Sequence, residues 1–217
     1  MTFLQKFKNS ALELRSVRCI CVTGVLIAMS IAISYFSIKI GDTVKITFGF
    51  IPRAAIGMLF GPVVGFISGT VTDIVSTLIK PDGAFNFLYT VVEAVGGMLY
   101  GIFLYGLKPV SFKGEQTNKR TNVVQVLKVI ISKVSVVVIC NLILTPAAHI
   151  LSGWWTLDVL PVKYPASLIK NAVQCPVDCV LLVLILFPIL LAYRKVFGYG
   201  NNGKNDNTLA NADMKKA

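Results

Sequence analysis

The sequence predicts an all-α membrane protein, a bundle of six transmembrane helices with both termini in the cytoplasm. Of the 217 residues, 55% are hydrophobic and only 14% are charged, and the mean hydropathy is +0.73. The apolar residues fall into runs long enough for helices that cross a bilayer, each of which needs about 20 residues. Most basic residues stand between these runs, where they fix the orientation of a membrane protein.

The chain opens with a basic amphipathic segment, residues 1–18, that we expect to lie on the cytoplasmic membrane surface. Phe3, Phe7 and Leu14 recur near helical spacing, with lysines and arginines between them. The first span is expected at about residues 19–38. This apolar run is too long for the core of a typical signal peptide, so we expect it to be retained. Residues 39–45 are expected to form a short polar loop.

The number of spans depends on residues 48–80, which are apolar but interrupted by Gly61-Pro62. If this dipeptide is only a kink, the stretch is one long tilted span and the total is five. If it is a turn, there are two spans and the total is six. Six spans place the basic residues of the lead-in, of segment 108–128 and of the C-terminal segment on one side, so the positive-inside rule favours six. The first of the two spans is short, and we expect its neighbours to shield it or its tilt to be small.

Three further spans are expected at about residues 85–107, 123–150 and 165–193. Pro81-Asp82-Gly83 marks a turn on the outer side, and residues 108–122 form a basic cytoplasmic loop. The outer segment 151–164 contains Trp154 and Trp155, which suit the membrane surface. The membrane domain therefore covers residues 19–196. Residues 197–217 have little apolar content and are expected to be a disordered cytoplasmic tail.

Polar side chains occur inside several predicted spans, where a buried charge costs roughly 3 kcal/mol or more and so marks a candidate functional site. A rise of 1.5 Å per residue places polar side chains of four spans at similar depth in the outer half of the membrane. These side chains are Asp73, Glu93, Asn141, Lys170 and Asn171. A water-accessible pocket that opens outward would explain them. The alternative is that Asp73 or Glu93 pairs with Arg53 or Lys170 only to hold the bundle together.

Motifs of several other function classes are absent from the sequence. There is no G-x-x-x-x-G-K-[ST] phosphate loop, so the chain cannot hydrolyse ATP in the usual way. No H-E-x-x-H or G-x-S-x-G motif occurs and His149 is the only histidine, which disfavours an enzyme. The five cysteines are odd in number and lack metal-ligand spacing, so we expect no disulfide, metal or other cofactor. The net charge of +11 is explained by membrane orientation and does not require nucleic acid.

Several motifs resemble the substrate-binding S component of energy-coupling factor (ECF) vitamin transporters, specifically the folate family. The most specific of them is the block from Gly49 to Gly83. The others are SIKIGD before that block, Ala28 and Ala32 in the first span, and LIKNAVQCPVD in the sixth. The resemblance covers nearly the whole chain, to about Val196.

The resemblance implies a six-helix subunit of the bacterial plasma membrane that catches a vitamin from outside with high affinity. Such a subunit is not an enzyme, because a membrane scaffold (T) subunit and two cytoplasmic ATPase (A) subunits drive uptake. In that scheme the small residues Gly24, Ala28 and Ala32, which recur every fourth residue, would form the face that meets the scaffold. The alternative is that this face packs inside the bundle.

If the ligand is folate, it carries a flat pterin ring with a polar edge. We expect the ring to stack on Phe85, Tyr89 or Trp154. We expect its edge to be bound by Asp73, Glu93, Asn141 and Asn171. Lys170, or Lys80 near the mouth of the pocket, would bind a carboxylate.

One departure from the folate family leaves the ligand open. The family usually has an arginine three residues before the pair Lys170-Asn171, where this chain has Ser167. Arg53 or Lys163 could replace that arginine as a partner for an anionic or heteroaromatic ligand. The alternatives are therefore an S component for another vitamin or heterocyclic precursor and, from a different class, a small channel or structural membrane bundle.

Overall fold

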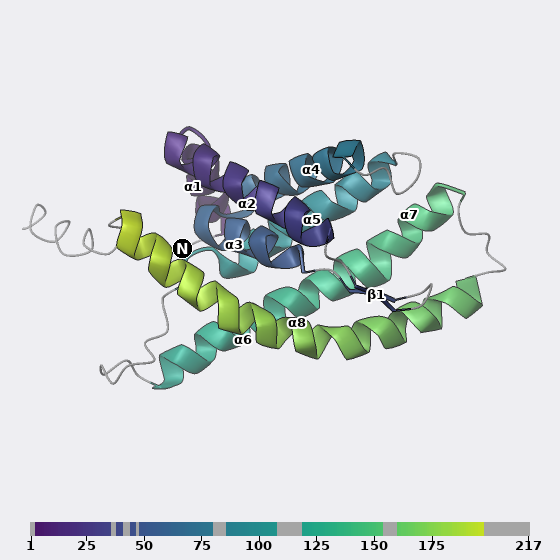
Figure 1. Ribbon diagram of the computed structural model, residues 1–217. Coiled ribbons are helices and arrows are strands. Elements are labelled where there is room, and N and C mark those ends of the chain that lie inside the picture. The colour runs from purple at the N-terminus through teal and green to yellow at the C-terminus, as the bar shows by residue number, and fades with distance from the viewer. Residues whose placement is uncertain are drawn as a thin grey trace, which may run out of the picture.

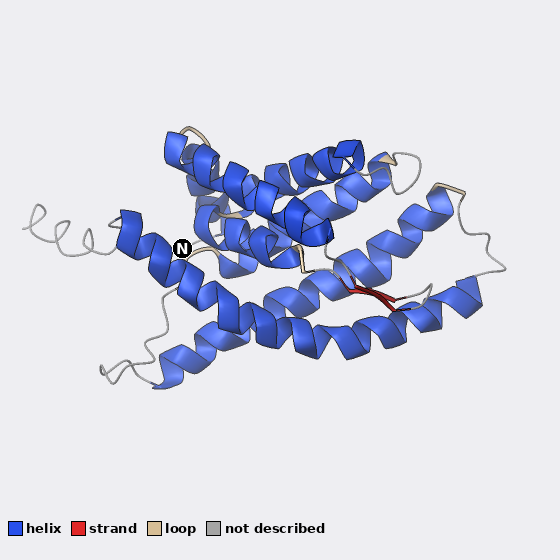
Figure 2. Cartoon of the chain, in the orientation of Figure 1, coloured by secondary structure: helices blue, strands red, loops and turns tan. Residues whose placement is uncertain are grey.

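Helices form nearly all of the computed structural model, which describes residues 3–35, 38–40, 44–46, 48–79, 86–107, 119–153 and 160–197 (Figure 2). The helices are α1 (Phe3–Glu13), α2 (Val17–Tyr35), α3 (Phe50–Phe60), α4 (Pro62–Ile79), α5 (Phe87–Leu104), α6 (Lys119–Val136), the π-helix η1 (Val137–Leu144), α7 (Thr145–Leu151) and α8 (Leu160–Phe197). The strands are β1 (Ile38–Ile40) and β2 (Val44–Ile46). The expected tail, apart from Phe197, lies outside the described residues.

The helices form the predicted membrane bundle. Five stretches are long and apolar enough to cross a membrane: Val17–Ser34, Pro62–Ile79, Phe87–Leu104, Asn122–Leu151 and Ser167–Phe197. α3 is a sixth apolar helix of 11 residues. α5 lies in the centre of the bundle, where it packs against α3, α4, α6, η1 and α7 (Figure 1).

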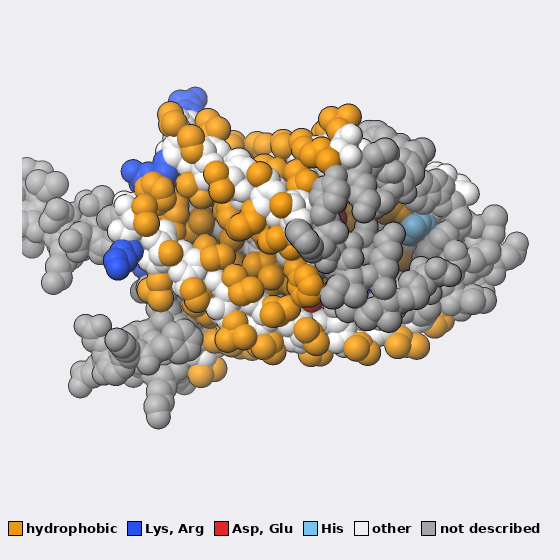
Figure 3. Space-filling view, viewed as in Figure 1, with side chains coloured by type: hydrophobic (Ala, Val, Ile, Leu, Met, Phe, Trp, Pro, Cys, Tyr) orange, Lys and Arg blue, Asp and Glu red, His pale blue; other side chains and the backbone are white. Residues whose placement is uncertain are grey.

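Contacts between helix ends show how the chain alternates between the two ends of the bundle. At one end, Arg194 of α8 donates a hydrogen bond to the carbonyl oxygen of Leu107, after α5 (3.1 Å). At the opposite end, the side chain of Asn86, before α5, is hydrogen bonded to Ser152, after α7. The beginning and the end of the described chain lie together at the first end (Figure 1), as an even number of crossings requires. Lysine and arginine side chains gather at that end, and hydrophobic side chains cover the middle of the visible face (Figure 3).

The break between α3 and α4 is a turn, which confirms the choice of six spans. Gly61 has a φ angle of +89°, in the left-handed region that favours glycine. α4 begins at Pro62, a favoured residue for the first position of a helix. The short α3 is also shielded as expected, since all its residues except Arg53 and Leu59 are buried.

α1 is attached to this turn through the fully buried hydroxyl of Ser10. This oxygen accepts hydrogen bonds from the backbone N–H groups of Val63 (3.0 Å) and Val64 (3.3 Å). N–H groups in the first turn of a helix have no partner within the helix. Ser10 therefore serves as an N-cap for α4 that is supplied by another helix. The Lys6 ammonium also donates a hydrogen bond to the carbonyl oxygen of Ile102 in α5 (2.8 Å), so α1 joins α4 to α5.

The segment expected to be a short polar loop is instead an antiparallel ribbon. β1 pairs with β2 in the register Ile38 to Ile46, Lys39 to Lys45 and Ile40 to Val44. The prediction was wrong because it weighed the two lysines more than the β-branched residues on either side of them. The alternation Ile-Lys-Ile and Val-Lys-Ile is typical of short strands.

α4 and α5 approach so closely that their backbones touch at glycines. A Cβ atom at Gly65 would collide with the carbonyl group of Gly97, and one at Gly97 would collide with that of Gly65. A Cβ atom at Gly57 of α3 would likewise meet the backbone of Gly101 in α5. Small residues at such positions let membrane helices pack at short distance. The helices α3, α4 and α5 therefore form a tight unit.

α8 is longer than the predicted sixth span. It has 38 residues, which corresponds to about 57 Å at 1.5 Å per residue, and it contains Pro165, Pro176 and Pro188. Because a bilayer core is about 30 Å thick, α8 extends beyond a single crossing, and it curves along the bundle (Figure 1). The part of the outer segment from Leu160 onward is thus helical.

Candidate substrate-binding site

Three polar residues on one face of α5 contact three other helices in the half of the bundle that contains Asn86. Tyr89 and Thr90 are neighbours in the sequence and stand four and three residues before Glu93, so each of them lies on the same side of the helix as Glu93. They contact α7, α4 and α3, respectively. α5 therefore connects the predicted site residues of several helices.

Arg53 and Glu93 form an ion pair between α3 and α5, from Nη1 to Oε2. Nε of Arg53 also donates a hydrogen bond to the carbonyl oxygen of Gly49 (3.3 Å). The two side chains are 20% and 38% exposed. Pairing of Glu93 with Arg53 was the alternative to a role in ligand binding. The pair neutralises the two charges, although neither side chain is fully buried.

Asp73 lies beside this pair. Thr90 Oγ1 of α5 donates a hydrogen bond to Asp73 Oδ2 of α4 (2.7 Å), and Arg53 is within electrostatic reach of Asp73. Asp73 is half-buried. The structure thus brings together two carboxylates predicted for the site, with one arginine between α3, α4 and α5.

Tyr89 contacts the only histidine of the chain. Its hydroxyl lies 2.8 Å from Nδ1 and 3.0 Å from Nε2 of His149, and the two rings meet edge to face with their centroids 5.4 Å apart. His149 belongs to α7, so this contact joins the outer ends of α5 and α7 together with the Asn86–Ser152 hydrogen bond. Tyr89 is half-buried and supplies an aromatic ring at the edge of the polar group.

Asn141 and Asn171 are hydrogen bonded to each other across the bundle. Nδ2 of Asn141 in η1 donates to Oδ1 of Asn171 in α8 (2.9 Å), and Nδ2 of Asn171 donates to the carbonyl oxygen of Ser167 (2.9 Å). Lys170 is half-buried and precedes Asn171 on α8. η1 also packs against α5, the helix that carries Glu93.

Three of the predicted ligand-binding residues, Lys80, Phe85 and Trp154, lie outside the described residues. The side chain of Lys163, proposed as a substitute for the missing arginine, is also outside them. Among the residues that the structure describes, no three His, Cys, Asp or Glu side chains lie close enough to hold a metal ion.

A second ion pair, which is buried, was not predicted from the sequence. Nζ of Lys133 in α6 lies 2.9 Å from Oδ2 of Asp178 in α8, and the side chains are only 7% and 4% exposed. The Lys133 ammonium also lies 3.9 Å from the centre of the Phe50 ring in α3, a cation–π contact. Opposite charges in consecutive antiparallel spans were the signal that could have revealed this pair.

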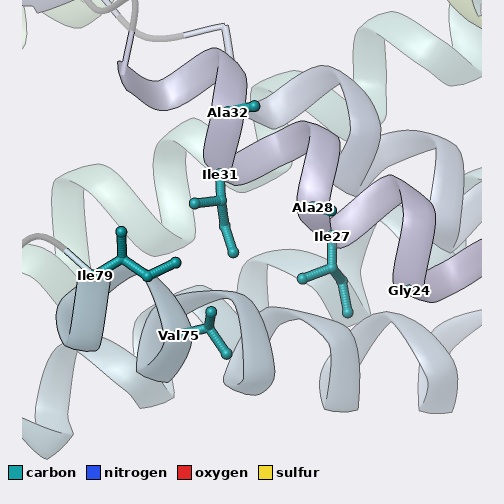
Figure 4. Close-up of a pocket in the computed structure, with 7 residues that line it drawn as sticks. All are labelled: Gly24, Ile27, Ala28, Ile31, Ala32, Val75 and Ile79. Carbon is teal, nitrogen blue, oxygen red and sulfur yellow. The ribbon is translucent and has the colours of Figure 1, made fainter.

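The small-residue face of α2 points away from the bundle. Gly24, Ala28 and Ala32 are all exposed, and they line one side of an apolar groove of about 580 Å³. Ile27 and Ile31 point from α2 toward Val75 and Ile79 of α4 across this groove (Figure 4). The exposure is compatible with the predicted scaffold interface, which stays a prediction.

Comparison with known proteins defines the class to which this bundle belongs. Residues 18–193 match the family described as ECF transporter, substrate-specific component, and the chain belongs to that family. It is therefore a multi-pass membrane subunit of a transporter and not an enzyme, and the alternative of a channel or a purely structural bundle is excluded. α1 lies before the matched residues.

Two of the individual relatives are folate transporters. The folate transporter FolT of Clostridium novyi (strain NT) is 27% identical over 170 residues, which cover 78% of this chain and 88% of the relative. FolT of Streptococcus mutans serotype c is 41% identical over 83 residues, or 38% of this chain and 45% of the relative. The crystal structure of FolT bound with folic acid has a TM-score of 0.62 and 30% identity, covering 77% of this chain and 92% of that chain.

Proposed function

We propose that this chain captures folate at the outer face of the membrane for an ATP-driven ECF transporter. The proposal is carried by two groups of polar side chains, one on α3, α4 and α5 and one on η1 and α8, in a subunit that has folate transporters among its relatives. Polar groups inside membrane helices are costly, so their concentration in one half of the bundle supports a ligand site.

The proposed ligand matches the chemistry of these side chains. Asn141 and Asn171 offer both donors and acceptors, as a pterin edge requires. The Asp73 and Glu93 carboxylates are acceptors for ring N–H and amino groups. Tyr89 provides an aromatic face for the ring, and Lys170 is the proposed partner of a glutamate carboxylate. We include Lys80, Phe85 and Trp154 in the proposal from the sequence alone.

The direct test is a calorimetric titration of the purified protein with folic acid. Lys170→Ala should weaken binding about tenfold or more, because a hydrogen bond to a charged group is worth about 1.5–3 kcal/mol and 1.4 kcal/mol is tenfold in affinity. Asn171→Ala should weaken it about two- to tenfold, because a hydrogen bond between neutral groups is worth about 0.5–1.5 kcal/mol. Lys128→Ala, at an exposed lysine of α6, is the matched control. Affinity that is unchanged in both site variants would remove them from the site.

The uptake machinery is also part of the proposal. An S component needs energy from other chains, and this sequence contains no phosphate loop. We propose a scaffold (T) subunit that meets Gly24, Ala28 and Ala32, with two ATPase (A) subunits bound to the scaffold. Co-purification of these subunits with the tagged chain tests this arrangement.

A second ligand class is favoured by one observation. Ser167 stands where the folate family usually has an arginine, and in this structure its backbone carbonyl binds Asn171. A site with one cation fewer suits a heterocyclic vitamin or precursor that carries less negative charge. Mass spectrometry of the small molecule that co-purifies with the protein distinguishes this ligand from folate.

A further inference from the structure

The fifth span contains an unusual segment. Its helix is interrupted by η1, eight residues of π-helix between α6 and α7. π-helices are rare, and they occur mostly as single turns at functional sites. Asn141, one of the proposed ligand-binding residues, lies within η1.

Thr145 and Pro146, which directly follow η1, account for its π-helical hydrogen bonding. Both the backbone N–H and the hydroxyl of Thr145 are bonded to the carbonyl oxygen of Cys140, five residues earlier, with the hydroxyl at 2.8 Å. Pro146 has no N–H, and in an α-helix its ring would clash with the carbonyl of Leu142. A local π-helical adjustment is one of the ways in which membrane helices accommodate a proline.

The π segment changes the direction in which the polar residues of this span point. Before it, Lys133 contacts Asp178 of α8, and within it Asn141 contacts α8. After it, His149 contacts Tyr89 of α5. Each residue of an α-helix turns by about 100°, so every extra residue in a π turn rotates the following helix by roughly that angle.

We propose that η1 positions the binding site, and that Thr145 is its positioning residue. By fixing the wider turn, Thr145 directs Asn141 toward Asn171 in α8 and His149 toward Tyr89 in α5. The site is thereby closed from two sides by one continuous span. This inference rests on the proposed function for the identity of the ligand, but the role of Thr145 in holding η1 does not depend on it.

The test compares Thr145→Val with Thr70→Val. The Thr70 hydroxyl also donates to a carbonyl of its own helix, that of Phe66 (3.1 Å), but in α4 and outside the proposed site. We expect Thr145→Val to accelerate amide hydrogen exchange over residues 140–146 in the ligand-free protein. We expect it also to weaken folic acid binding about fivefold and to reduce discrimination against an analogue with an amino group in place of the ring oxo group. Thr145→Ser keeps the hydroxyl, so its hydrogen exchange, its affinity for folic acid and its discrimination against the analogue should match those of the unsubstituted protein.

Loss of discrimination is the decisive readout, because a purely structural loss would weaken both ligands equally. Pro146→Ala is a second variant, since it restores the N–H that favours an α-helical turn, and it should lower discrimination in the same way. The inference is overturned if both variants match Thr70→Val in exchange and in discrimination. If the unsubstituted protein does not bind folic acid, the proposed function fails instead, and hydrogen exchange still tests the role of Thr145.

Discussion

The helices before residue 108 and those after residue 118 are held together by different means. In the first group, α3, α4 and α5 touch backbone to backbone at glycines such as Gly65 and Gly97. In the second group, residues 119–152 and 160–197 contain no glycine, and side chains make the ion pair between α6 and α8 and the hydrogen bond between η1 and α8. One half of the proposed site therefore lies on a tightly packed unit. The other half is set by a few polar pairs and by the π-helix.

The largest effect on stability is expected in the second group, at the Lys133–Asp178 pair. Asp178→Ala should lower the free energy of unfolding by about 3–5 kcal/mol, because it leaves a buried charge without its partner. The double variant Lys133→Met, Asp178→Leu should be much closer to the original protein. Denaturant unfolding in detergent micelles measures both. Equal losses in the single and the double variant would show that the pair itself stabilises the second group.

The next effect concerns the glycine contacts of the first group. Gly97→Ala should cost about 1–3 kcal/mol, since its Cβ would overlap the Gly65 carbonyl. Gly96→Ala is a control one residue away, because a Cβ at Gly96 would have only the Cys140 sulfur nearby, at 3.7 Å. The two variants are compared by thermal unfolding. If they are equally stable, close packing does not distinguish the two groups of helices.

A smaller effect is expected where α1 caps α4. Ser10→Ala should cost about 1 kcal/mol, the usual loss on removal of an N-cap side chain. Asn9→Ala, at the neighbouring position of α1, serves as the control. Faster hydrogen exchange at Val63 and Val64 should accompany the loss in Ser10→Ala alone. Identical exchange in the two variants would mean that α4 does not depend on the cap.

The smallest effect on stability is expected at the exposed face of α2. Ala28→Trp should leave the unfolding of the isolated subunit unchanged, because the face does not pack inside the bundle. Under the proposed function it should nevertheless abolish uptake in cells while sparing folic acid binding. Met29→Trp, about 100° around the same helix, is the control. Normal uptake by Ala28→Trp would place the scaffold interface elsewhere.

The spans could be foreseen from the sequence because they depend on local composition. Apolar run length and the positive-inside rule gave six spans, and Gly61-Pro62 marked the turn between α3 and α4. The ribbon at Ile38–Ile46 was missed because six residues of alternating pattern give a weak signal beside two lysines. Pro146 was visible in the sequence, but a proline in a membrane helix can produce a kink as well as a π-helix.

Side-chain partners could be foreseen only in part. Depth along each span brought Asp73, Glu93, Asn141 and Asn171 to the same half of the bundle. Depth does not give the rotation of each helix about its own axis. That rotation determines that Glu93 pairs with Arg53 and that Lys133 pairs with Asp178. η1 rotates the rest of the span by an angle that is left out when residues are counted at α-helical spacing. The contact of His149 with Tyr89 was therefore not anticipated.

The cap that Ser10 supplies to α4 has a consequence for biosynthesis. α1 leaves the ribosome before α4, and the partner backbone groups at Val63 and Val64 emerge about fifty residues after Ser10. The cap can therefore form only after the start of α4 has been synthesised. A bulky fusion partner at the amino terminus that kept α1 from docking would leave α4 without this cap, with a loss of stability like that of Ser10→Ala.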